Sequence, residues 1–153
     1  MALNSQRAEL TSSNLAGAIM TLFKISQDYA LKLYEECLQK YFNELKPIPL
    51  KVEPINELGL FKFDIDNFSL VNPQIIISNK KYRTDEGYKN TILHELIHYS
   101  VYSKLSDDEI YKAISSNNQE IFDELLEMGK HAHGKKWNSE KDTINNIYNL
   151  NIR

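Results

Sequence analysis

The chain has 153 residues, of which 42% are hydrophobic and 25% charged, and its formal net charge is -3. This length suits one domain that buries its own core, and the acidic balance argues against a strongly basic nucleic-acid binder. Cys37 is the single cysteine, which excludes an internal disulfide and a four-cysteine zinc site. The first residues lack a secretory signal pattern, and no window is apolar enough for a membrane span, so we expect a cytoplasmic protein without membrane contact.

The N-terminal part has a helical pattern. Between residues 13 and 45, apolar residues recur at spacings of three or four, as in an amphipathic helix; they are Leu22, Ile25, Tyr29, Leu33, Cys37, Tyr41 and Leu45. Ser26 is a suitable N-cap for a second helix in this region. We therefore predict an N-terminal helical extension over residues 1–25, and a main domain over residues 26–153.

Three short extended runs follow: Leu50–Val52, Gly59–Ile65 and Ile75–Ile77. The second run alternates apolar and polar residues, and the third is continuously apolar, and both patterns are typical of strands. We predict that the three runs form a small three-stranded sheet.

A helix is predicted next, from about Asp85 to Tyr102, with Thr84 as its N-cap. Its side chains are apolar in nearly every direction, which indicates a buried helix. This pattern predicts an α+β fold in which the N-terminal helices and the sheet pack on this helix.

Further helices are expected toward the C-terminus. Ser106 with Glu109, and Ser116 with Gln119, have the spacing of capping boxes that begin two short helices. Gly129 is a suitable stop for the second of them, and a last helix is predicted from about Ser139 to Leu150.

The residues His94-Glu95-Leu96-Ile97-His98 match the pattern H-E-x-x-H. Two histidines four apart on a helix project from one face, so one zinc ion can bind both rings. A catalytic zinc has three protein ligands and keeps a fourth position for water. Glu95 would act as the general base on that metal-bound water, which predicts a zinc-dependent endopeptidase that hydrolyses peptide bonds in protein substrates.

The third ligand must come from another part of the chain. His131 and His133 are the two remaining histidines. His131 could alternatively be an outer hydrogen-bond partner. Asp123 and Glu124 are further candidates, because carboxylates also bind zinc.

The segment His133-Gly134-Lys135-Lys136-Trp137 resembles the H-G-x-x-W element that follows H-E-x-x-H in the SprT-like family, which includes the Spartan metalloproteases. The resemblance covers residues 27–150 and implies a zincin-like fold of the SprT type. It also implies that His94, His98 and His133 bind zinc and that Glu95 is the catalytic base. Two departures are a longer stretch between His98 and His133, and the absence of the C-terminal cysteine pairs of many bacterial members.

Two other functions remain open. One is a small regulatory metallopeptidase of the ImmA/IrrE class that acts on a repressor, which is suggested by size and by Glu120 and Glu124. The other is a zinc-stabilised binding module without catalysis. A partner that is bound to nucleic acid would need a basic rim, and eight cationic residues flank the motifs: Lys80, Lys81, Arg83, Lys89, Lys130, Lys135, Lys136 and Lys141. These are better explained as solvated surface charges.

Overall fold

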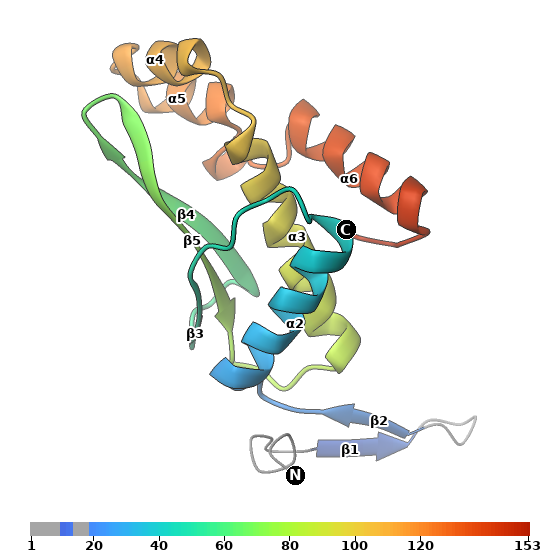
Figure 1. Ribbon diagram of the computed structural model, residues 1–153. Coiled ribbons are helices and arrows are strands. Elements are labelled where there is room, and N and C mark those ends of the chain that lie inside the picture. The colour runs from blue at the N-terminus through green and yellow to red at the C-terminus, as the bar shows by residue number, and fades with distance from the viewer. Residues whose placement is uncertain (1–9, 14–18) are drawn as a thin grey trace.

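The computed structural model describes residues 10–13 and 19–153, in which helix α3 (Asp85–Ser103) lies at the centre (Figure 1). It contacts α2 (Gln27–Tyr41) and α6 (Lys135–Tyr148), and it also packs on the sheet. The Thr84 hydroxyl caps its first turn by accepting from the Gly87 N–H at 3.0 Å. The predicted α+β class, with a small sheet against this helix, is therefore confirmed.

The N-terminal extension differs from the prediction where it can be described. Strands β1 (Leu10–Ser13) and β2 (Ile19–Leu22) form an antiparallel pair instead of a helix. The chain then stays extended, because Phe23 exchanges two backbone hydrogen bonds with Arg83, of 2.9 and 3.0 Å. The helical spacing in fact belongs to α2, which begins just after its N-cap Ser26. Residues 1–9 and 14–18 of the predicted extension lie outside the described residues.

The three-stranded sheet is mixed, with the strand order β3-β5-β4. β3 (Leu50–Glu53) runs parallel to β5 (Ser69–Ser78), and β4 (Gly59–Asp66) pairs antiparallel with β5. The hairpin of β4 and β5 extends beyond the body of the molecule toward α4 and α5 (Figure 1). β4 is an edge strand, and it packs on α3.

Two short helices, α4 (Asp107–Ser115) and α5 (Gln119–Leu126), separate α3 from the last part of the chain. The capping box of Ser106 with Glu109 is present as predicted. Asn118, and not Ser116, caps α5, since its side chain accepts from the Ile121 N–H at 3.1 Å. No helix of the described residues is long and apolar enough to cross a membrane.

The last helix, α6, begins at Lys135, four residues before the predicted start, and follows a single 3-10 turn, η1 (Gly129–His131). The chain then returns from the end of α6 to α3 (Figure 1). Ile152 anchors this return in the core with 3% of its surface exposed. Its backbone N–H and C=O both bond to the Asn145 side chain. The returning segment thereby reaches the site described next.

Candidate metal centre

Two histidines project from one face of α3. The ring centroids of His94 and His98 are 5.1 Å apart, as expected for residues separated by about one helical turn. Both lie in the middle of a helix that is held by its neighbours on several sides. The four-residue spacing of the H-E-x-x-H pattern therefore places the two histidine rings next to each other.

His133 completes the group from the loop between η1 and α6. Its Nε2 atom lies 3.0 Å from Nε2 of His94, and candidate ligand atoms of all three histidines lie within 4.8 Å of one another. Two zinc ligands at 2.0–2.1 Å in tetrahedral geometry would be roughly 3.3 Å apart. The three rings can therefore hold one metal ion with small adjustments.

The alternative ligands lie elsewhere. His131 Nε2 is 3.0 Å from Glu120 Oε1, on the solvent-facing side of α5. Asp123 accepts from the Gln119 side chain at 2.8 Å. Glu124 is also outside the cluster that the three histidines form. The structure thus brings together His94, His98 and His133 and leaves the other candidates apart.

The protonation of the rings suits metal binding. The pKa of His98 is lowered to about 3, mainly by burial and in smaller part by the neighbouring His94 and His133. Burial also lowers the pKa of His94 and of His133. Neutral imidazole is the form that binds a metal. All three rings are therefore neutral at pH 7, and each offers a nitrogen lone pair.

The orientation of His94 is set by the returning C-terminal segment. Nδ1 of His94 lies 2.6 Å from the backbone oxygen of Arg153, which can only accept a hydrogen bond. Nδ1 therefore carries the proton, and Nε2 is left with a lone pair facing His133. The Asn90 side chain holds the same segment by donating to the Asn151 carbonyl at 3.1 Å.

Trp137 packs against all three histidines. Its ring centroid is 4.8 Å from that of His94, 5.5 Å from that of His98 and 4.4 Å from that of His133. Only 3% of its surface is exposed. Trp137 therefore forms the buried side of the cluster and fixes the rings by packing.

Glu127 ties the His133 loop to α6. It ends α5 in the left-handed region at φ 54°, and its buried carboxylate accepts from the Lys136 N–H at 2.9 Å and the Trp137 N–H at 3.0 Å. These are free donors of the first turn of α6, which has no side-chain cap at Gly134. A Cβ on Gly134 would lie 2.7 Å from Glu127 Cδ. Glycine is therefore needed beside His133 to admit this carboxylate.

Glu95 is buried beside the cluster, with 5% of its surface exposed. Burial raises the pKa of its carboxyl to about 8, and a hydrogen bond from the Phe61 N–H of β4 opposes that rise. β4 approaches closely here, since a Cβ on Gly59 would lie 2.7 Å from Thr91 Cγ2 and 3.1 Å from Glu95 Oε2. Glu95 is thus held between α3 and the edge strand.

A cleft of about 770 Å³ opens along the face of α3 that carries His94 and Glu95. One wall is the start of β4 at Leu58 and Gly59, and the other is the segment Leu150–Arg153. A cleft of this size can admit several residues of an extended peptide. His94 and Glu95 are accessible to such a ligand from one side.

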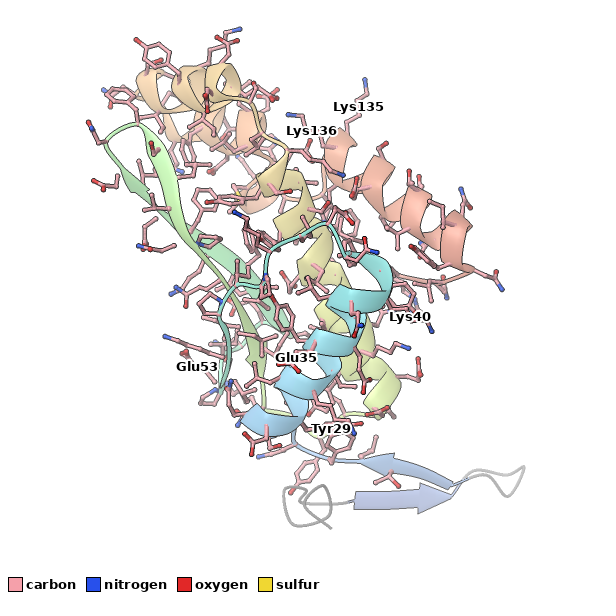
Figure 2. The ribbon with its side chains drawn as sticks, viewed as in Figure 1. Tyr29, Glu35, Lys40, Glu53, Lys135 and Lys136 are labelled. Carbon is pink, nitrogen blue, oxygen red and sulfur yellow. The ribbon has the colours of Figure 1, made fainter. Side chains whose placement is uncertain are left out.

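The eight cationic residues of the predicted basic rim divide into two groups. Several are paired: Lys130 lies 3.0 Å from a Glu120 oxygen, and Lys136 bonds to Glu109. Lys135 projects away from the start of α6 beside Lys136 (Figure 2). Arg83 and Lys89, in contrast, line the cleft. A continuous basic face around the cluster is therefore not formed by the described residues.

Comparison with known protein families, curated proteins and solved structures finds no match for this chain. What the chain does is therefore inferred from the site itself.

Sequence reasoning missed three parts of this site. Glu127 and Gly59 act through contacts between elements, and the Arg153 carbonyl reaches His94 across 59 residues of sequence. Gly134 of the H-G-x-x-W element was the one sequence feature that indicated such a contact, because a glycine beside a ligand indicates that another group approaches closely.

Proposed function

We propose that the chain is a zinc-dependent endopeptidase with a zincin-like, SprT-type site, in which His94, His98 and His133 hold the metal. The observation that supports this most is the convergence of three neutral histidine rings from two elements, next to a buried glutamate and an open cleft. Nitrogen donors in this number are typical of catalytic zinc, because a fourth position stays open.

Zinc bound by these rings would supply a Lewis acid that polarises a carbonyl and lowers the pKa of water. The protein's own part is carried by Glu95. Its carboxylate is buried beside the cluster, where it can accept a proton and return it. It would take the proton of the attacking water and deliver it to the leaving amine.

The other residues of the site orient these groups. The Arg153 carbonyl fixes the tautomer of His94, and Trp137 keeps the rings in place from the buried side. The Phe61 N–H holds Glu95 at the edge of the sheet. A substrate backbone would lie along the cleft between β4 and the Leu150–Arg153 segment.

The test is proteolysis by the purified, zinc-loaded protein. We expect cleavage of an unfolded protein such as casein, loss of cleavage on addition of a chelator, and recovery with zinc. Glu95→Gln should retain zinc and lose cleavage by several orders of magnitude, since it cannot accept a proton. Cleavage that survives in Glu95→Gln would contradict the proposed role of Glu95.

The same preparation separates the alternatives. Zinc lost in Glu124→Ala but retained in His133→Ala would favour an ImmA/IrrE-like site. Bound zinc without cleavage of any offered protein would favour a zinc-stabilised binding module. Cleavage that requires added DNA would indicate substrates associated with nucleic acid.

A further inference from the structure

The cleft beside Glu95 is basic although the chain as a whole is acidic. Arg83, Lys89 and Arg153 line it, and Glu86 is the one acidic lining residue other than Glu95. The chain has a formal net charge of -3. Within the described residues, none of the three cations has an ion-pair partner. The cleft therefore presents net positive charge to a substrate.

Arg83 has the most unusual surroundings of the three. Its Nη2 atom donates to the Gly87 carbonyl at 2.9 Å, but its buried Nη1 atom has no hydrogen-bond partner in the described part of the chain. The guanidinium lies over the Tyr88 ring, 5.1 Å from the centroid, which fixes its position. A partly buried guanidinium normally has an anionic partner. Arg83 therefore lines the cleft with a fixed guanidinium that has no anionic partner among the described residues.

The position of Arg83 relative to Glu95 gives a length scale. Gly87, Thr91 and Glu95 follow one another at intervals of four on one face of α3, and all three line the cleft. The eight residues from Gly87 to Glu95 correspond to about 12 Å of helix. An extended peptide covers about 3.3 Å per residue, so three or four of its residues span this distance.

We propose that the cleft binds an acidic stretch of polypeptide, with a carboxylate three or four residues from the scissile bond paired to Arg83. This inference rests on the proposed peptidase function and names its substrate class. Nucleic acid is a poorer fit, because Lys130 and Lys136 outside the cleft are paired with acids and do not extend the positive charge along a nucleic-acid backbone.

The direct test is a set of peptides of one neutral sequence in which a single Asp is moved position by position around the cleavage site. We expect kcat/KM to rise at least about tenfold when Asp stands three or four residues away on one side, as for a partly desolvated charge pair. Added salt should reduce this preference. Equal kcat/KM for every Asp position would overturn the inference while leaving the peptidase function intact.

Reversing the charge of Arg83 gives a variant that tests the same peptide position. Arg83→Glu should transfer the preference from Asp to Lys at the same peptide position, which loss of fold cannot imitate. Lys89→Glu is a second variant on the exposed part of the cleft, and it should reduce the Asp preference in the same direction. Lys51→Glu, on β3 and outside the cleft, is the control and should keep the wild-type preference. A preference for Asp that persists in both cleft variants would contradict the proposal.

Binding separates this inference from the proposed function. Zinc-loaded Glu95→Gln should bind a fluorescent acidic peptide more tightly than its neutral counterpart, and Arg83→Glu in that background should abolish the difference. If no protein is cleaved but this binding pattern is found, the acidic-peptide site stands without the peptidase. If a short oligonucleotide displaces the peptide and binds more tightly than it, the cleft is a phosphate site and the proposal is wrong.

Discussion

The two halves of the candidate metal centre are built in different ways. His94 and His98 lie on α3, where the helix itself fixes their separation, and α3 is capped and packed on several sides. His133 lies in a short loop whose position depends on contacts with α5 and α6 through Glu127. The positions of His94 and His98, the helical half of the centre, are therefore fixed within one helix. The position of His133, the loop half, depends on contacts between elements that are far apart in the sequence. This difference predicts which changes the site tolerates.

Loss of a ligand should have the largest effect, whichever half it belongs to. His98→Ala and His133→Ala should each weaken zinc affinity by more than the roughly 100-fold that loss of an outer partner costs. Isothermal titration with zinc measures this. His131→Ala is the control, because its ring lies against Glu120 and outside the cluster. Equal affinities in His133→Ala and wild type would show that the loop half is not part of the site.

Glu127 should matter to the loop half alone. Glu127→Ala removes the acceptor of the Lys136 and Trp137 N–H groups, so we expect zinc affinity to fall by about 10- to 100-fold. Glu127→Gln, which keeps one acceptor, should lie in between. The chemical shifts of His133 should change more than those of His98 in the metal-free protein. A loss of affinity with unchanged His133 signals would contradict the positioning role.

Gly134 gives an independent test of the same contact. Gly134→Ala should weaken zinc binding in wild type, because its methyl group would meet the Glu127 carboxyl at 2.7 Å. In the Glu127→Ala background the methyl group has room, so the second substitution should cost less. Fully additive losses of binding free energy would show that the two residues do not act through their contact.

Gly59 tests the packing of β4 on the helical half. Gly59→Ala should lower the free energy of unfolding by about 1–3 kcal/mol, since its Cβ would overlap Thr91. Chemical denaturation of the metal-free protein measures this change. Gly87→Ala is a milder comparison, because its Cβ would lie 3.2 Å from Thr84 Oγ1 and 3.3 Å from Arg83 Nη2, both less severe than the 2.7 Å at Gly59. A larger loss at Gly87 than at Gly59 would contradict the close approach of β4.

The metal-free protein should show a specific pH dependence of stability. The pKa of Glu95 is about 8 in the folded protein and 4.5 as an unperturbed group, so the folded state holds the extra proton between these values. Stability should therefore fall as pH rises through this range, by at most about 1.4 kcal/mol per pH unit. The lowered pKa values of His94, His98 and His133 act in the opposite sense, and this effect fades only as pH rises above the unperturbed value of 6.5.

The clearest window is thus about pH 7.5 to 8, where Glu95 still holds its extra proton in the folded state and the three histidines are almost fully neutral in both states. Denaturation in the presence of a chelator should show declining stability across this window. Glu95→Gln should remove the decline. A wild-type profile that rises between about pH 7.5 and 8 would show that Glu95 is not buried as described.

The sequence predicted the helical half of the centre and its surroundings better than the loop half. The sheet, α3 and its cap, and the pair of histidines were predictable because spacing along a helix or strand fixes the direction of a side chain. The predicted helix before Ser26 was wrong, because Leu22 and Ile25 continue the helical spacing by chance while the backbone of Phe23 pairs with Arg83.

The loop half was not predictable from spacing. Residue type left His131 and His133 as candidates for the third ligand, and only the resemblance of the H-G-x-x-W element favoured His133. The sequence did not indicate that α5 ends at Glu127, because a glutamate in the left-handed region is uncommon. Gly129, two residues later, is of the residue type that more usually ends a helix. Its partners at the start of α6 are nine and ten residues away, a separation with no sequence signature. Contacts of this kind need the assembled fold.

Anomalous diffraction at the zinc edge, from crystals of the zinc-loaded protein, tests the central claim most directly. The account predicts one strong peak at 2.0–2.1 Å from Nε2 of His94, Nε2 of His133 and a ring nitrogen of His98. A zinc peak bound by other residues, or three rings with no peak between them, would contradict it.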